Sequence, residues 1–174
     1  MSNTEFWNAR YAEAGYAYGT EPNAFLVSQK RYLKPGMTAL AVADAILALE
    51  MKTGKLRWFN QPTPHDLHDW DATQPLVHVE ELYQGQRRKL LMQANRNGFF
   101  YVLDRTNGKL LMAKPFVKKM DWASGIGPDG MPILLPDYAP PDEGHLKCPA
   151  VRGATNWFST SYNPGTKLFY VMAA

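Results

Sequence analysis

The pattern of apolar and polar positions divides the chain near residue 45. Residues 4–34 carry aromatic and apolar side chains at helical spacing, and Glu-Pro-Asn at 21–23 separates two helical stretches. A Lys-Pro-Gly turn at 34–36 precedes Ala-Leu-Ala-Val-Ala-Asp at 39–44, an apolar run that predicts a buried strand ending in an acid. Residues 1–45 are therefore expected to form a short α/β segment.

After residue 45 the pattern favours β-structure. Short apolar runs alternate with turns that contain glycine, which supplies the positive φ of tight hairpins at little cost. Gly54 and Gly108 stand in similar strand–turn–strand sequences 54 residues apart, and a third version surrounds Gly165. A repeat of this length is typical of β-propeller blades. Residues 46–174 are therefore expected to be mainly β, a partial propeller of about three blades with a long irregular stretch at 112–152.

Composition limits the classes of function. The net charge of +3 is small, and the basic cluster at 87–89 is too short to indicate nucleic-acid binding, so a solvated loop or strand edge is the better interpretation. The single cysteine, Cys148, excludes an internal disulfide. No run approaches the roughly 20 apolar residues of a membrane span. Residues 1–10 show no secretory signal, so the sequence as given is expected to stay in the cytoplasm.

Two acids and one arginine stand out as candidate site residues. Asp69 and Asp71 lie in His-Asp-Leu-His-Asp-Trp-Asp at 65–71, and an extended segment would project both to the same side. Carboxylate oxygens are ligands that hard cations prefer. Arg96 lies in Asn-Arg-Asn-Gly at 95–98, where its guanidinium can hydrogen-bond adjacent oxygens. Taken singly, these motifs are also typical of a turn-capping carboxylate and a surface arginine.

Three motifs occur in order: the acidic segment at 64–71, Asn-Arg-Asn-Gly-Phe-Phe-Tyr-Val-Leu-Asp-Arg at 95–105, and Gly-Ala-Thr-Asn-Trp at 153–157. As a set they resemble the C-terminal part of quinoprotein alcohol dehydrogenases, β-propeller enzymes that use pyrroloquinoline quinone (PQQ). The sequence at 48–58 also resembles the tryptophan-docking motif of that family, which implies that Trp58 packs against a neighbouring blade. The resemblance covers residues 46–174.

The resemblance implies a role for each candidate residue. Asp69 matches the catalytic base that takes the alcohol proton and is also a metal ligand, while Asp71 matches an extra acid in members that prefer lanthanides. Arg96 matches the basic residue that reaches the quinone oxygens. Asn156 and Trp157 match the element that contacts PQQ. The implied cofactor is PQQ with calcium or a lanthanide, the implied substrate is a small-molecule alcohol, and the resembled family is periplasmic.

Residues 1–44 carry a different resemblance. Phe-Trp-Asn at 6–8, Tyr-Gly-Thr-Glu-Pro-Asn at 18–23 and Leu-Lys-Pro-Gly at 33–36 resemble the N-terminus of tellurite-resistance-type methyltransferases that use S-adenosylmethionine (SAM). In that family a glycine-rich loop after the first strand lets the backbone approach the cofactor. Here Asp44 is followed by Ala-Ile-Leu-Ala-Leu, without those glycines. The two resemblances together imply a chimera, with a methyltransferase-like segment at 1–45 and propeller blades at 46–174.

The resembled enzymes close eight blades around an axial site, and this sequence has material for about three. It lacks the first metal ligands and the adjacent cysteines of the family, and His68 stands where the family has a tryptophan. We therefore expect a fragment of a PQQ-dependent alcohol dehydrogenase-like oxidoreductase that is inactive alone. The first alternative is a non-catalytic structural or binding fragment, or a fusion artefact. The second alternative is a degenerate SAM-dependent methyltransferase. Open blade edges predict self-association.

Overall fold

The computed structural model describes residues 40–42, 45–50, 52–139 and 146–174. The helices expected within 4–34 lie outside these residues and remain predictions. The chain divides into two compact units, Met1–Met37 and Thr38–Ala174, and all described residues belong to the second. The segment boundary expected at 45/46 also remains a prediction.

The regular elements of the described residues are all β-strands, which confirms the expectation of a mainly β chain. No helix within the described ranges is long and apolar enough to cross a membrane. The strands are β1 (Leu40–Val42), β2 (Ala45–Leu49), β3 (Leu56–Asn60), β4 (Val77–Tyr83), β5 (Gln86–Ala94), β6 (Phe99–Asp104), β7 (Leu110–Pro115), β8 (Ala123–Ile126), β9 (Pro132–Leu134), β10 (Ser161–Asn163) and β11 (Leu168–Tyr170).

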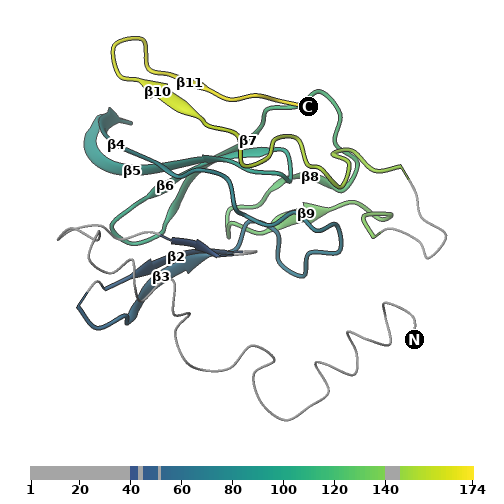
Figure 1. Ribbon diagram of the computed structural model, residues 1–174, viewed down its shortest axis with the longest axis horizontal. Helices are drawn as coiled ribbons and strands as arrows, with labels where there is room; N and C mark the ends of the chain where they lie inside the picture. The colour runs from purple at the N-terminus through teal and green to yellow at the C-terminus, as the bar shows by residue number, and fades with distance from the viewer. Residues whose placement is uncertain (1–39, 43–44, 51, 140–145) are drawn as a thin grey trace. The chain divides into compact units, whose positions relative to one another are not determined.

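Strands β4–β7 form an antiparallel four-stranded sheet in sequence order, which is the arrangement of a propeller blade. Figure 1 shows them as successive neighbours coloured from teal to green. Strand β5 changes along its length, because its first four side chains are exposed or partly exposed whereas those from Leu90 to Ala94 are all buried. The buried end of β5 leads into the turn that carries Arg96.

The three hairpins that the glycine-containing turns predict are present. In each turn a backbone N–H donates to the carbonyl four residues earlier: from Gly54 at 2.7 Å, from Gly108 at 2.8 Å and from Lys167 at 2.7 Å. The first two glycines have φ values of 71° and 75°, in the left-handed region that glycine adopts without a steric penalty. Local sequence was therefore sufficient to predict these turns.

Trp58 of β3 connects the three-stranded sheet β1–β2–β3 to the four-stranded sheet. Its indole Nε1 donates to the carbonyl of Arg105 at 3.1 Å. A Cβ on Gly108 would lie 2.7 Å from the Trp58 ring, so only glycine allows this approach. The blade-docking contact implied for Trp58 is thus present. Partly buried Trp58 packs on a buried cluster of Ile46, Leu91 and Leu103.

The stretch at 112–152, which was expected to be irregular, contains further strands. Strand β7 runs to Pro115, and β8 and β9 form an antiparallel hairpin. Gly127 N donates to the Met131 carbonyl at 2.7 Å in its turn. The prediction was wrong here because strands of 4 and 3 residues are too short for alternation of apolar and polar positions to show.

An aromatic cluster supports the end of the four-stranded sheet that carries Arg96. Trp70 and Trp122 pack edge to face with ring centroids 5.2 Å apart, and Phe99 packs edge to face on Trp122 at 5.9 Å. Trp70 lies in the loop at 61–76, whereas Phe99 belongs to β6. All three side chains are buried, so the cluster fixes the acidic loop against β6.

Candidate functional site

The turn between β5 and β6, at 95–98, is built from buried polar groups. Asn95 Oδ1 accepts a hydrogen bond from the Asn97 N–H at 3.0 Å, and Gly98 N donates to the Asn95 carbonyl at 3.0 Å. Asn95 and Asn97 are fully buried, and Arg96 is 9% exposed. The alternative of a surface arginine in a solvated turn is therefore wrong.

Asn97 joins this turn to the start of the acidic loop. Its Nδ2 lies 3.2 Å from the Pro62 carbonyl, 3.0 Å from Thr63 Oγ1 and 2.9 Å from the Tyr101 hydroxyl. Its Oδ1 accepts from the Phe99 N–H at 3.1 Å. Burial raises the pKa of Tyr101, so its hydroxyl stays protonated and donates to the Pro62 carbonyl.

Two buried glutamines hold the far end of the acidic loop. Gln93 Nε2 donates to the carbonyls of Ala72 and Gln74 at 3.1 and 3.0 Å. Gln74 Nε2 donates to the Asp71 carbonyl at 3.0 Å, and Gln74 Oε1 accepts from the Arg96 N–H at 3.3 Å. Both side chains are at most 1% exposed. These hydrogen bonds place Asp71 beside Arg96.

The bend that carries Asp69 is stabilised by Asp66. The Asp66 carboxylate accepts hydrogen bonds from the backbone N–H of His68, at 2.7 Å, and of Trp70. Asp69 has a φ of 62°, so the extended geometry that would project it to the same side as Asp71 is not present. The turn-capping role considered for Asp69 belongs to Asp66, and Asp69 itself is exposed.

Arg96 is held from several directions. Its Nη1 lies 4.0 Å from Asp71 Oδ2, and its Nη2 donates to the Val151 carbonyl. Its Nε is buried and has no hydrogen-bond partner among the described residues. A guanidinium carries five N–H donors, so one that pairs with a single carboxylate and donates to one carbonyl keeps hydrogen-bonding capacity for an anionic ligand.

The segment at 150–155 packs directly on Arg96. Ala154 N donates to the Arg96 carbonyl at 2.8 Å, and Trp70 Nε1 donates to the Ala150 carbonyl at 3.0 Å. A Cβ on Gly153 would lie 2.6 Å from the Arg96 Cβ, and Gly153 has a φ of 79°. The glycine of Gly-Ala-Thr-Asn-Trp is therefore required for this close approach.

Asn156 and Trp157 follow this segment, but their hydrogen bonds are local. Asn156 Nδ2 donates to the Arg152 carbonyl at 3.0 Å, and Asn156 Oδ1 accepts from the Trp157 N–H at 2.9 Å. The Trp157 side chain is largely exposed, with a residue exposure of 75%. The backbone of the motif thus contacts Arg96, whereas its two predicted cofactor-binding side chains form no hydrogen bond to Arg96 or Asp69 in the described part of the chain.

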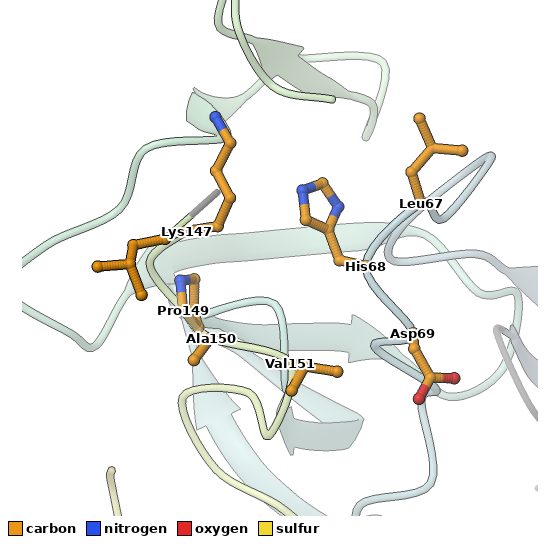
Figure 2. Close-up of a pocket in the computed structure, with 8 residues that line it drawn as sticks. Leu67, His68, Asp69, Lys147, Pro149, Ala150 and Val151 are labelled. Atoms are coloured by element: carbon orange, nitrogen blue, oxygen red, sulfur yellow. The ribbon is translucent and has the colours of Figure 1, made fainter. Parts of the chain in front are cut away.

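An open pocket of about 420 Å³ lies beside Asp69, and most of its lining is apolar. Figure 2 shows the Asp69 carboxylate directed away from the imidazole of His68. The pocket is lined by two segments, with Leu67, His68 and Asp69 from one and Leu146, Lys147, Pro149, Ala150 and Val151 from the other.

The described residues do not by themselves form a metal centre. Across 40–42, 45–50, 52–139 and 146–174, His, Cys, Asp and Glu side chains nowhere gather in a group of three or more that could hold a metal ion. Asp71 is paired with Arg96, and calcium takes about six to eight oxygen ligands. Asp69 and Asp71 would therefore need further ligands to hold a cation.

His68 predicts a pH dependence of stability. Its ring stacks on Trp70 at 4.1 Å, and burial lowers its pKa below 6.5 against the opposing effect of the Asp66 carboxylate. The unfolded chain therefore binds this proton at higher pH than the folded chain, and stability is lost as pH falls below 6.5 towards the folded pKa. We expect His68→Phe, which keeps the stacking, to reduce the fall in urea midpoint between about pH 7.5 and about pH 5.5. An unchanged fall would contradict this assignment.

Several residues that build the site escaped the sequence analysis. Gln74, Gln93 and Asn97 are uncharged amides with no catalytic signature, yet they carry the hydrogen bonds that join the acidic loop to the Arg96 turn. Gln93 stands within the apolar run at 90–94. An amide inside an apolar strand indicates a buried hydrogen-bonding role, and this signal could have identified it.

Comparison with known proteins agrees with this architecture. Residues 36–117 match the family model described as "PQQ: Glucose/ethanol/alcohol dehydrogenase, beta-propeller domain". Quinohemoprotein alcohol dehydrogenase ADH IIB of Pseudomonas putida is 47% identical over 129 residues, which cover 74% of this chain and 19% of that protein. The 1-butanol dehydrogenase (cytochrome c) of Thauera butanivorans is 36% identical over 163 residues, which cover 94% of this chain and 23% of that protein.

Solved structures show the same relationship. Quinohemoprotein alcohol dehydrogenase from Comamonas testosteroni matches with a TM-score of 0.72 at 41% identity, covering 75% of this chain and 19% of that chain. A europium-containing methanol dehydrogenase matches with a TM-score of 0.71 at 33% identity, covering 75% and 23%.

The first 45 residues are partly included in these matches. The family model begins at residue 36, the match to the butanol dehydrogenase reaches into residues 1–45, and β1 pairs with β2 across the expected boundary. The methyltransferase-like segment and the chimera remain predictions. The described strands are part of a quinoprotein-type β-propeller, and the chain, which spans about a fifth of the length of these relatives, is a fragment-length homologue of the PQQ-dependent quinoprotein alcohol dehydrogenases.

Proposed function

We propose that this chain contributes part of the PQQ-binding site of an alcohol dehydrogenase-like oxidoreductase and that it is inactive alone. One observation carries the proposal: Arg96, in the turn at 95–98, is largely buried and paired with Asp71, and its guanidinium forms one side-chain hydrogen bond within the described residues, to the Val151 carbonyl. Such a guanidinium has the charge and the donor capacity that an anionic quinone requires.

Each predicted site residue has a distinct task in this proposal. When bound, PQQ supplies an ortho-quinone that accepts electrons from the alcohol. Arg96 donates hydrogen bonds to anionic oxygens, and Asp71 fixes its position as a counter-ion. Asp69, which is exposed and lines the apolar pocket, accepts the hydroxyl proton of a small alcohol. Asn156 and Trp157 add an amide contact and an aromatic contact.

Metal binding by this chain alone is expected to be weak. The acidic loop offers Asp69 and Asp71, and no third ligand joins them among the described residues. Calcium or a lanthanide, the ions that the resemblance implies, would need additional oxygen ligands. The cytoplasmic location expected from the sequence as given remains a prediction.

A non-catalytic binding role is the second candidate, and the β10–β11 hairpin favours it. This sheet has two strands, and Leu168 and Tyr170 of β11 are about half exposed. Unpaired strand edges with apolar side chains promote association, so we propose self-association through this edge. A fusion artefact, or a degenerate methyltransferase in residues 1–45, remains the alternative if no cofactor binds.

The experiment that tests the first proposal is a PQQ titration followed by quenching of the five tryptophans, with and without Ca²⁺ or La³⁺. We expect saturable quenching by the wild-type chain. Asp69→Ala/Arg96→Ala is expected to raise Kd at least about tenfold, because a hydrogen bond to a charged group contributes about 1.5–3 kcal/mol. A metal-dependent gain in affinity would be assigned to the acidic loop that carries Asp69 and Asp71, and a metal-independent component to Arg96.

The matched control is Asp137→Ala/Arg87→Ala, which makes the same change in charge at two exposed positions. This control is expected to bind PQQ like the wild type. Equal loss of PQQ affinity in both double variants would show that the loss comes from the removal of charged side chains in general and not from Asp69 and Arg96. Absence of saturable quenching by the wild-type chain would refute the PQQ proposal and leave the binding or structural role.

A further inference from the structure

One buried side chain forms hydrogen bonds to the backbones of both residues of the Asp71–Arg96 pair. Gln74 Nε2 donates to the Asp71 carbonyl at 3.0 Å, and Gln74 Oε1 accepts from the Arg96 N–H at 3.3 Å. The Gln74 side chain is 1% exposed, so neither hydrogen bond competes with bulk water. The amide therefore bridges the acidic loop and the arginine turn.

Gln74 supplies the third hydrogen bond that holds Arg96 in place. The Arg96 carbonyl accepts from Ala154 N at 2.8 Å, the Arg96 side chain donates to the Val151 carbonyl, and the Arg96 N–H donates to Gln74. On the other side, Gln74 holds the backbone of Asp71, whose carboxylate lies 4.0 Å from Arg96. Gln74 is therefore the one side chain among the described residues that hydrogen-bonds the backbone of both the carboxylate and the guanidinium residue.

A neighbouring glutamine has a different set of partners. Gln93 Nε2 donates to the carbonyls of Ala72 and Gln74, and Gln93 Oε1 accepts from Asn95 Nδ2 at 3.1 Å. Gln93 is as deeply buried as Gln74 and forms one more hydrogen bond. Its loss therefore costs at least as much stability, while its hydrogen bonds reach neither Asp71 nor Arg96.

We propose that Gln74 is a positioning residue that sets the Asp71–Arg96 pair in the geometry that receives an anionic ligand. This inference rests on the proposed PQQ function for the identity of the ligand. Gln74 touches neither reacting atoms nor ligand in this assignment and acts through Arg96 and Asp71. Small displacements of a positioned charged group cost binding and rate, so the bridge matters more for the ligand than for folding.

The test compares Gln74→Met, Gln74→Glu and Gln93→Met in the full chain. Methionine keeps the length of the side chain and removes its hydrogen-bonding groups. Glutamate keeps the acceptor for the Arg96 N–H and replaces the donor to Asp71 with an oxygen. Amide hydrogen exchange of Arg96 and its Nε resonance are measured by NMR without ligand, and PQQ affinity is measured by tryptophan quenching.

We expect Gln74→Met to accelerate exchange of the Arg96 amide at least about tenfold and to raise the Kd for PQQ at least about tenfold. Gln74→Glu is expected to preserve protection of the Arg96 amide while weakening PQQ binding. Gln93→Met removes hydrogen bonds to the loop backbone but none to Asp71 or Arg96, so it is expected to change both quantities less than Gln74→Met does, although it lowers the urea midpoint at least as much.

The outcomes separate the two proposals. Equal effects of Gln74→Met and Gln93→Met on the Arg96 resonances would overturn the positioning role, whatever happens to PQQ affinity. A second outcome combines two results: Gln74→Met releases Arg96 while Gln93→Met does not, and the wild-type chain binds no PQQ. This outcome would refute the PQQ function and uphold the positioning of the pair. If Gln74→Met accelerates exchange of the Arg96 amide but binds PQQ with the wild-type Kd, the link between positioning and ligand binding is overturned.

Discussion

Gly153→Ala is expected to lower the free energy of unfolding by about 2–5 kcal/mol and to displace Arg96. The left-handed φ of 79° costs a non-glycine residue about 1–2 kcal/mol. The new Cβ would also lie 2.6 Å from the Arg96 Cβ and 2.8 Å from its Cα, and overpacking of this kind costs about 1–3 kcal/mol. Because one of these atoms is backbone, the collision cannot be relieved by a rotamer change. Urea unfolding measures the loss.

Gly85→Ala is the matched control for Gly153→Ala. Gly85 has a φ of 78°, and a Cβ built on it meets nothing within 4 Å. This variant therefore reports the cost of backbone conformation alone, and we expect a loss of about 1–2 kcal/mol with PQQ affinity unchanged. If the two variants lose equal stability, the predicted collision with Arg96 is absent in solution.

Asn97→Leu is expected to lower the free energy of unfolding by about 2–4 kcal/mol. Leucine has nearly the same shape, but it removes the acceptor of the Phe99 N–H and the donor that reaches Thr63 and the Pro62 carbonyl. Each buried polar group left without a partner costs about 1–3 kcal/mol. The start of the acidic loop at 62–63 would lose its side-chain hydrogen bonds to the Arg96 turn as a consequence. The urea midpoint and the Nε resonance of Arg96 measure the two effects.

Asn107→Leu provides the comparison for Asn97→Leu. Asn107 Oδ1 accepts from the N–H two residues later, at 2.9 Å, as Asn97 does, but it lies in an exposed hairpin turn. Water replaces the lost partner there, so we expect less than about 1 kcal/mol. A similar loss in both variants would show that the buried contacts of Asn97 add nothing to the local turn.

These predictions share one physical basis. Three segments without regular secondary structure meet at the site: the loop at 61–76, the turn at 95–98 and the segment at 150–155. Amide side chains and close approach of the backbone hold these segments together. Their backbone groups are buried and must find partners, and Gln74, Gln93 and Asn97 supply them. The aromatic cluster around Trp70 and Trp122 shields these hydrogen bonds from water.

The fold of residues 46–174 was largely predictable from sequence, because its information is local. Glycine-containing turns near Gly54, Gly108 and Gly165 predicted three hairpins that the structure contains. Gly54 and Gly108 adopt the positive φ of a tight turn, whereas in the third turn Lys167 does so. The β8–β9 hairpin was missed because strands this short show no pattern of their own. The charged and aromatic candidates of the site were visible as motifs, whereas the amides of Gln74 and Gln93 that support them were not.

The arrangement of the site was decided by tertiary structure alone. Sequence identified Asp69, Asp71, Arg96, Asn156 and Trp157 as one set. The structure pairs Asp71 with Arg96, places Asp69 at a left-handed bend and leaves the Trp157 side chain exposed. The physical reason is that the decisive contacts join residues far apart in the sequence. Gln74 hydrogen-bonds Arg96, 22 positions away, and Gly153 packs on Arg96 from 57 positions away. Spacing along the chain specifies a turn, but packing and the pairing of buried polar groups specify which turns meet.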